Sequence, residues 1–177
     1  MSCIISTFTM LMMYQNALSS KRLREIADYD ILTGIRNRNA FERERDGWAE
    51  RCTVSLSCVY VDVNGLHELN NSEGHDRGDR MLQTAAMELR STFGKNNCYR
   101  TGGDEFVVFV MDQDHAAVRK KVSDMIFSIE EQGYSAAVGV ATESAGGIEV
   151  GTLARKAEKR MYLEKEEHYR ALNQTGR

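Results

Sequence analysis

The sequence contains no proline and only four cysteines. Without proline, the turns of the chain must rely largely on its 14 glycines. Cys3, Cys52, Cys58 and Cys98 show neither a Cys-x-x-Cys pair nor a Cys/His spacing, which argues against the usual zinc motifs. We therefore interpret the four residues as reduced thiols of a cytoplasmic protein.

The sequence also lacks an excess of positive charge and long apolar runs. The net charge is −3 and the isoelectric point is near 5.9, so no basic surface indicates a nucleic-acid partner. The apolar run at residues 3–14 is too short to span a bilayer, and it lacks the basic start of a secretion signal. We expect no membrane contact by the main domain, although the run is compatible with the remnant of a longer, sensor-linked protein.

The length of 177 residues and the 42% apolar content suit one domain with a short extension. Residues 1–27 form the predicted N-terminal helical extension, and residues 28–177 form the main domain. The polar, helical stretch at residues 15–28 is typical of a coupling helix from an absent sensor domain. A purely structural helix explains the same stretch equally well.

A β-hairpin with an acidic tip is predicted over residues 99–110. Gly102 and Gly103 are expected to supply the positive φ angles of a tight turn, and the β-branched and aromatic residues after them predict a buried strand. Asp104 and Glu105 lie where the turn enters that strand. Two adjacent carboxylates repel each other and favour a divalent cation, although a solvated acidic turn is the simpler alternative.

A second strand, predicted over residues 53–63, brings another carboxylate. Its apolar far end is typical of a central strand covered on both faces, and Asp62 lies at its carboxyl end, where ligands usually bind in α/β sheets. If this strand neighbours the hairpin, Asp62, Asp104 and Glu105 converge and could hold two divalent ions. The alternative role of Asp62 is to cap the next turn.

The remaining pattern predicts helices around these strands. Asn37 is a suitable N-cap for a helix to residue 50, and Gly94 ends a helix that carries an apolar stripe. The predicted segments are a helix at 38–50 with Phe41 and Trp48 inward, a short helix or loop at 66–71, a polar loop at 72–79, helices at 80–93 and 115–132, a strand at 134–141, a loop at 142–148, and a helix at 150–168 with Leu153, Ala157, Met161 and Tyr162 inward. This order indicates a mixed α/β (α+β) domain.

Four spaced segments of the chain resemble the GGDEF family of diguanylate cyclases. They read DILTGIRNRNAF at 30–41, DVNGLHELNNSEGHDRGD at 62–79, RTGGDEF at 100–106 and ARKAEKRMYLEK at 154–165. The resemblance covers roughly residues 28–170. It implies a five-stranded central sheet wrapped by helices, similar to nucleotidyl cyclase and polymerase palm domains.

The resemblance also implies an activity in cyclic di-GMP signalling. Two GTP molecules, one on each subunit of a homodimer, would be condensed into cyclic di-GMP with release of pyrophosphate. Two Mg²⁺ or Mn²⁺ ions per active site would be bound by Asp62, the backbone carbonyl of Val63, Asp104 and Glu105. Asp104 would also take the proton of the attacking 3′-hydroxyl, so Asp104 and Glu105 are the principal catalytic candidates.

Several further positions match the family's substrate-binding residues. Asn70 and Asp79 match the residues that recognise guanine, and Lys165 matches a lysine that binds the terminal phosphates. Leu66, Gly102 and Gly103 also fall in the implied nucleotide site. From the residues alone, the simpler interpretations are a turn residue for Asn70, a helix N-cap for Asp79 and a surface lysine for Lys165.

The chain departs from the family pattern at three places. His67, a catalytic candidate, stands where the family often has a lysine linked to phosphate charge, and a neutral histidine would stabilise that charge less. Tyr169 stands where an arginine is expected, with Arg170 beside it. The Arg-x-x-Asp of the family's inhibitory product site falls on residues 93–96, Phe-Gly-Lys-Asn, so we expect no feedback inhibition there.

These departures leave alternatives open. The first is a catalytically weak or inactive module that binds GTP as a regulatory domain. A further alternative is a metal-dependent polymerase-like enzyme or a mononucleotide cyclase, which would release different products.

Overall fold

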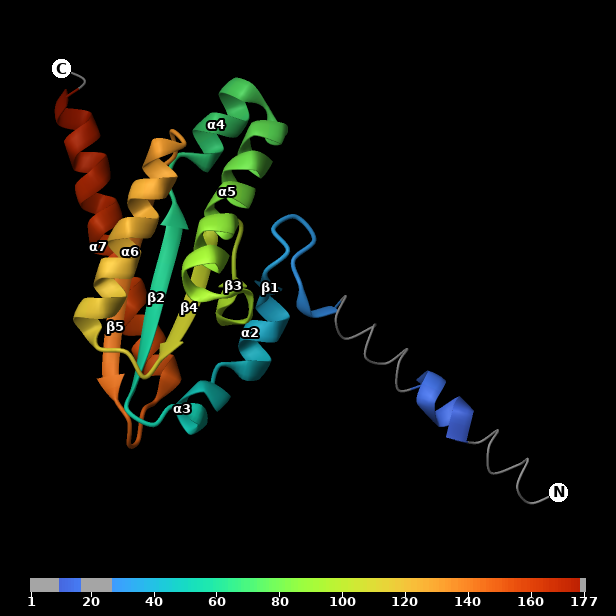
Figure 1. Ribbon diagram of the computed structural model, residues 1–177. Helices are drawn as coiled ribbons and strands as arrows, with labels where there is room; N and C mark the ends of the chain where they lie inside the picture. Colours follow the sequence, from blue (N-terminus) through green and yellow to red (C-terminus); the bar gives the residue numbers. More distant parts are fainter. Residues whose placement is uncertain (1–9, 17–26, 176–177) are drawn as a thin grey trace.

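The structure is a computed structural model that describes residues 10–16 and 27–175, with side chains described to residue 170 (Figure 1). A short helix covers residues 10–16. Most of the helix predicted at residues 15–28 falls at residues 17–26, outside the described residues. Within the described part of the chain, no helix is both long enough and apolar enough to cross a membrane.

The main domain alternates strands and helices. The elements are β1 (Arg36–Asn37), α2 (Arg38–Glu44), α3 (Gly47–Arg51), β2 (Ser55–Val63), α4 (Leu66–Glu73), α5 (His75–Phe93), a 3₁₀ turn η1 (Lys95–Asn97), β3 (Cys98–Arg100), β4 (Glu105–Met111), α6 (His115–Glu131), β5 (Ala136–Ser144) and α7 (Val150–Thr175).

The strands form one five-stranded sheet in the order β1-β3-β4-β2-β5. β1 pairs with β3 in parallel, while β3–β4, β4–β2 and β2–β5 are antiparallel. β2 therefore lies inside the sheet, as its apolar sequence predicted. Residue Tyr60 is the only residue of β2 that is not fully buried.

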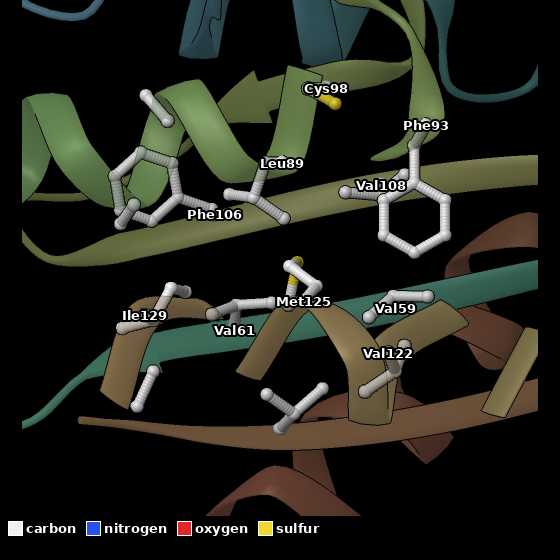
Figure 2. Close-up of a cluster of buried hydrophobic side chains, with 14 of the residues drawn as sticks. Val59, Val61, Leu89, Phe93, Cys98, Phe106, Val108, Val122, Met125 and Ile129 are labelled. Carbon is white, nitrogen blue, oxygen red and sulfur yellow. The ribbon is translucent and has the colours of Figure 1, made fainter. Parts of the chain in front are cut away.

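Helices cover both faces of the sheet. In Figure 1, α5 and α6 cross one face and α7 runs behind the other. Figure 2 shows the first layer, in which Leu89 of α5 and Met125 of α6 pack with Val59 and Val61 of β2. The predicted five-stranded sheet wrapped by helices is confirmed.

The second face is built on aromatic side chains. Phe41 of α2 stacks on Phe109 of β4 with ring centroids 6.0 Å apart. Trp48 of α3 donates a hydrogen bond from Nε1 to the Tyr99 hydroxyl at 3.0 Å, which satisfies the buried indole N–H. The inward orientation predicted for Phe41 and Trp48 is confirmed.

Three expectations about local structure are wrong. The helix predicted over 38–50 is two helices, because the chain turns at residues 45 and 46. The loop predicted at 72–79 is almost entirely helical, with Gly74 at φ 86° as the only residue between α4 and α5. The polar composition there reflects the exposed surface of both helices. Tyr162 is 58% exposed and does not face the core.

Element ends also differ. β5 extends to Ser144, so residues 142–144 belong to a strand and not to the predicted loop. α7 continues to Thr175, well beyond the predicted end at 168. Cys52, Cys58 and Cys98 are buried free thiols, as expected, while Cys3 lies outside the described residues.

Candidate active site

Three carboxylate residues meet at one end of β2 and β4. Asp62 stands opposite Glu105 in the antiparallel register of the two strands. The N–H of Val63 donates to the carbonyl of Asp104 at 3.0 Å, which ties the residue after Asp62 to the residue before Glu105. The convergence predicted from sequence is therefore present in the fold.

The turn that carries Asp104 differs from the expected one. Gly102 and Gly103 do not adopt positive φ. The N–H groups of Thr101 and Gly102 both donate to the Glu105 carbonyl, at 3.0 and 3.3 Å, and this closes the loop. A Cβ at Gly102 would lie 2.7 Å from Glu105 Oε2, whereas a Cβ at Gly103 would meet open space. Gly102 thus leaves room for the Glu105 side chain, and its backbone angles do not call for glycine.

An ion pair that the sequence reasoning missed braces the same turn. Arg100 donates from Nη2 to the Gly103 carbonyl at 2.7 Å and from Nη1 to Asp30 Oδ1 at 2.9 Å. Asp30 also accepts from the N–H and the hydroxyl of Thr33. Burial alone would raise the pKa of Asp30, but these hydrogen bonds outweigh burial and lower it. The Asp-x-x-Thr spacing is an Asx-turn signal that could have indicated the Asp30–Thr33 contact.

The pKa values of two of the acidic residues, Asp62 and Glu105, are raised. Burial, and then the charge of Asp104, raise the pKa of Asp62 against the opposing effect of Lys165. Burial raises the pKa of Glu105, and the charges of Asp62, Asp104 and Glu158 raise it further. Such shifts at the end of a buried strand are typical of a site that binds a cation.

A lysine from α7 contacts this cluster. Lys165 Nζ donates to Asp62 Oδ1 at 2.6 Å. Burial would lower the pKa of Lys165, but its hydrogen bond and charge interaction with Asp62 outweigh burial and raise it. Sequence reasoning alone treated Lys165 as a surface residue, and only the resemblance placed it in the site.

The donor set suits a hard divalent cation, because carboxylate and carbonyl oxygens are the ligands that Mg²⁺ and Mn²⁺ prefer. Burial is the main reason for the raised pKa values of Asp62 and Glu105, and the neighbouring carboxylates add to it. However, no group of three or more His, Cys, Asp or Glu side chains in the described ranges is arranged to hold a metal as it stands. The carboxylates lie near one another, but their side chains are not oriented as a complete set of metal ligands.

Close packing of α7 on β5 positions the lysine. A Cβ at Gly139 of β5 would overlap the carbonyl oxygen of Ala157 and the backbone N of Met161. Gly139 therefore lets the backbone of α7 lie directly on the strand. Lys165 follows Met161 by one helical turn and reaches β2 from there. Gly139 is a positioning residue that sequence reasoning missed, and a glycine inside a strand pattern was the available signal.

Residues near Lys165 form a hollow on α7. Lys165, Tyr169 and Arg170 line it together with Tyr162 and Glu166, and its volume is about 370 Å³. Arg170 donates to Glu166 Oε2 at 3.4 Å. The hollow therefore combines two basic side chains with two tyrosines.

The guanine-recognition candidates lie on α4 and α5. A Cβ at Gly78 would overlap the side-chain oxygen of Asn70, so this glycine allows Asn70 to reach α5 next to Asp79. Asn70 Oδ1 is buried without a hydrogen-bond partner, and Asp79 is exposed in the second turn of α5. Asp79 is thus not an N-cap. Leu66 is half-buried and packs against the core.

The structure does not join His67 to the acidic cluster. Its side chain is exposed on α4, and Nε2 lies 3.0 Å from Nδ2 of Asn71. Among the described residues, the hydrogen bonds of His67 do not include the carboxylates of Asp62, Asp104 or Glu105.

Comparison with known proteins gives one consistent result. The sequence model of the family described as "Diguanylate cyclase, GGDEF domain" matches residues 27–171. The solved structure of the coiled coil and GGDEF domain of DgcB from Caulobacter crescentus, in complex with c-di-GMP, has a TM-score of 0.80 and covers 90% of this chain and 91% of its own. At 17% identity this likeness concerns the fold alone, and it agrees with the predicted palm-like architecture.

Two curated relatives have different names. Diguanylate cyclase DgcS from Shewanella oneidensis is 31% identical over 159 residues, which cover 85% of this chain and 53% of DgcS. Cyclic di-GMP phosphodiesterase PdeB from the same organism is 34% identical over 119 residues, which cover 67% of this chain and 14% of PdeB. The chain therefore spans about half of DgcS and a small part of PdeB.

Proposed function

Because the chain belongs to the GGDEF domain family, we propose that it is a diguanylate cyclase, which converts two GTP into cyclic di-GMP and two pyrophosphates. One observation carries this proposal: Asp62, Asp104 and Glu105 meet at one end of β2 and β4. The similarity to DgcS supports synthesis. The match to PdeB covers only 14% of that protein, so its name does not decide what the shared region does.

Each 3′-hydroxyl attacks the α-phosphorus of the other GTP, and pyrophosphate leaves. Such phosphoryl transfer depends mainly on positioning and on charge stabilisation. Asp104 accepts the proton of the attacking hydroxyl. Asp62, the carbonyl of Val63, Asp104 and Glu105 would hold two Mg²⁺ or Mn²⁺ ions, which would supply charge neutralisation of the triphosphate and a lower pKa for the hydroxyl.

The remaining candidates bind the nucleotide. The unpartnered Asn70 Oδ1 suits the N–H donors of guanine, and Asp79 on the adjacent helix adds a second acceptor. Lys165 binds the terminal phosphates from α7, while Leu66, Gly102 and Gly103 border the nucleotide. His67 is exposed beside them and contributes less charge than a lysine would.

The reaction needs two nucleotides whose hydroxyl and phosphate groups face each other. A single acidic cluster of this kind holds one GTP, so a second copy of the chain must supply the other. We therefore propose a homodimer as the active species. The sensor input would come from segments outside the domain.

One observation favours a regulatory alternative. His67 replaces a phosphate-linked lysine and points to Asn71 instead of the carboxylates. A module that binds GTP without turnover would regulate a neighbouring domain. Calorimetry that finds GTP binding in the absence of product would favour this second function.

The test is product analysis. The protein is incubated with GTP and Mg²⁺, and separately with Mn²⁺, and the products are separated by chromatography. We expect cyclic di-GMP, at a rate that rises faster than linearly with protein concentration. Asp104→Asn should lower that rate at least about a hundredfold, because it removes the general base and a metal ligand.

The matched control is Asp124→Asn on the exposed surface of α6, which should retain full activity. Circular dichroism of both variants should match the wild type. Absence of cyclic di-GMP with both metals at high protein concentration contradicts the proposal, and cyclic mononucleotide or linear products indicate a different cyclase or polymerase chemistry.

A further inference from the structure

The contact between Lys165 and Asp62 occupies a carboxylate that the proposed reaction needs. The distance from Nζ to Oδ1 is 2.6 Å, and the Asp62 side chain is only 7% exposed. A charge-assisted hydrogen bond of this length belongs to the stronger class of polar contacts. In this state the protein's own ammonium group fills one coordination position of Asp62.

The contact is fixed by the fold and is not a chance surface pair. α7 is seated on β5 at Gly139, and β5 pairs with β2 so that Ala137 lies opposite Asp62. Lys165 itself is 27% exposed. By contrast, the pair between Lys156 and Glu143 has the same 2.6 Å distance, but the lysine is 56% exposed. That pair serves as a natural reference for an ordinary surface contact.

One ammonium group does not balance the cluster. Asp62, Asp104 and Glu105 lie close together, and Lys165 is the cation hydrogen-bonded to Asp62. No set of three such side chains in the described ranges is arranged to hold a metal. Independently of that arrangement, Lys165 Nζ already contacts Asp62 Oδ1, so a divalent ion that binds this oxygen has to displace the ammonium group.

We infer that Lys165 guards Asp62 in the nucleotide-free domain, so that Asp62 becomes a strong metal ligand only when Lys165 leaves it. The inference rests on the proposed function for what draws the lysine away. A triphosphate beside the cluster offers Lys165 a second anionic partner with more charge than one carboxylate. GTP thus opens the metal site by attracting the guarding lysine, and tight metal binding follows nucleotide binding.

The test measures Mn²⁺ binding to the nucleotide-free protein by electron paramagnetic resonance of the free ion. Wild-type protein should bind Mn²⁺ weakly. Lys165→Met removes the competing ammonium and should tighten Mn²⁺ binding by about tenfold or more, the effect of losing one strong charged contact. Lys156→Met, the matched control, should leave Mn²⁺ affinity at the wild-type value.

A double variant, Asp62→Asn with Lys165→Met, locates the effect. Its Mn²⁺ affinity should fall back to the wild-type level or below, because the released carboxylate is gone. Should Lys165→Met fail to fold, Lys165→Gln gives the same comparison with a side chain that stays polar. Affinity for a non-hydrolysable GTP analogue should fall in both single Lys165 variants.

Equal Mn²⁺ affinity of wild type and Lys165→Met overturns the inference, as does a gain that persists in the double variant. None of these measurements needs turnover. If Mn²⁺ affinity rises as expected but no cyclic di-GMP forms, the proposed cyclase activity fails while the guarding role of Lys165 stands.

Discussion

Asp62 and Glu105 lie opposite each other on neighbouring strands, and the charge of Asp62 adds to burial in raising the pKa of Glu105. A sheet built for stability alone would not place two carboxylates in register at this position. The arrangement is the kind of local conflict that proteins retain at functional sites.

The first prediction is that Glu105→Gln stabilises the protein while it removes activity. Burial and the charges of Asp62, Asp104 and Glu158 raise the pKa of Glu105, so at pH 7 the ionised side chain disfavours the folded state. Because Glu105 is partly exposed and solvent screens its charge, its replacement should add only about 0.5 kcal/mol to the free energy of unfolding at pH 7. Urea unfolding of both proteins measures the difference.

The pH dependence of that gain has a definite sign. As pH falls through the raised folded-state pKa of Glu105, the wild-type side chain takes up a proton and loses its penalty. The advantage of Glu105→Gln should therefore shrink toward zero as the pH approaches 4, roughly the unperturbed glutamate value. Glu131→Gln, on an exposed residue of α6, should change little at either pH. A variant less stable than wild type at pH 7 would contradict the electrostatic account.

The second prediction concerns the brace of the acidic turn. Arg100 is 14% exposed and joins Asp30 to the Gly103 carbonyl. Arg100→Gln should lower the unfolding free energy by about 1–2 kcal/mol, less than the loss of a fully buried pair. The substitution should also lower cyclase activity, because Gly103 loses its hydrogen bond from Arg100 and Asp104 is the next residue in the chain. Chemical denaturation and GTP turnover give the two readouts.

The same pair sets a second pH dependence. Hydrogen bonds from Thr33 and Arg100 hold the pKa of Asp30 below its ordinary value despite burial. That stabilisation is present above the unfolded-state pKa and is lost as pH falls through the lower folded-state pKa. Wild type and Arg100→Gln should therefore converge in stability at strongly acidic pH. Arg77→Gln, in an exposed pair with Glu73, should stay within about 0.5 kcal/mol of wild type throughout.

The third prediction is that Gly139→Ala displaces α7. The added Cβ would overlap the backbone of Ala157 and Met161, so the helix must move. We expect a loss of about 1–3 kcal/mol of stability, the usual cost of overpacking. Activity should fall further than stability explains, because Lys165 moves with the helix. Gly47→Ala in α3 meets no atom within 4 Å and should be neutral or slightly stabilising, and equal effects of both substitutions would refute the positioning role.

The fourth prediction is the absence of feedback inhibition at the segment before the hairpin. Phe93 is buried in the core, and Lys95 lies over the Tyr29 ring with Nζ 4.3 Å from its centroid. Residues 93 and 96 are Phe and Asn, so the Arg and the Asp expected of that product site are both missing. Initial rates with added cyclic di-GMP should follow simple competition with GTP. Non-competitive inhibition would show that the product binds at a separate site.

Local pattern was enough to predict β2 to β5 and much of the core, whereas β1 was not predicted and the five-stranded sheet came from the family resemblance. β2 is apolar without interruption over residues 58–61 because both of its faces are covered there, and the stripe on α5 repeats at helical spacing because one face of the helix packs on the sheet. Asn37 caps α2 through its side chain, as its residue type indicated. These features depend on neighbours within the same segment.

Features that depend on side-chain contacts, with near or distant residues, were missed or misread. Gly102 looked like a turn glycine, but its role is set by the Glu105 side chain that folds back onto it. Gly139 and Arg100 acquire meaning only from α7 and from Asp30, which are far away along the chain. The segment at 72–79 was predicted to be a loop because the exposed ends of two helices have the same polar composition as a loop. Contacts with distant segments therefore decided the roles of Gly139 and Arg100.

The most direct test of the central claim is anomalous diffraction from crystals of the protein with Mn²⁺ and a non-hydrolysable GTP analogue. Our account predicts Mn²⁺ peaks bordered by Asp62, Asp104 and Glu105, with the triphosphate beside them and Lys165 moved from Asp62 to the phosphates. Nucleotide bound without Mn²⁺ at these three residues would contradict it.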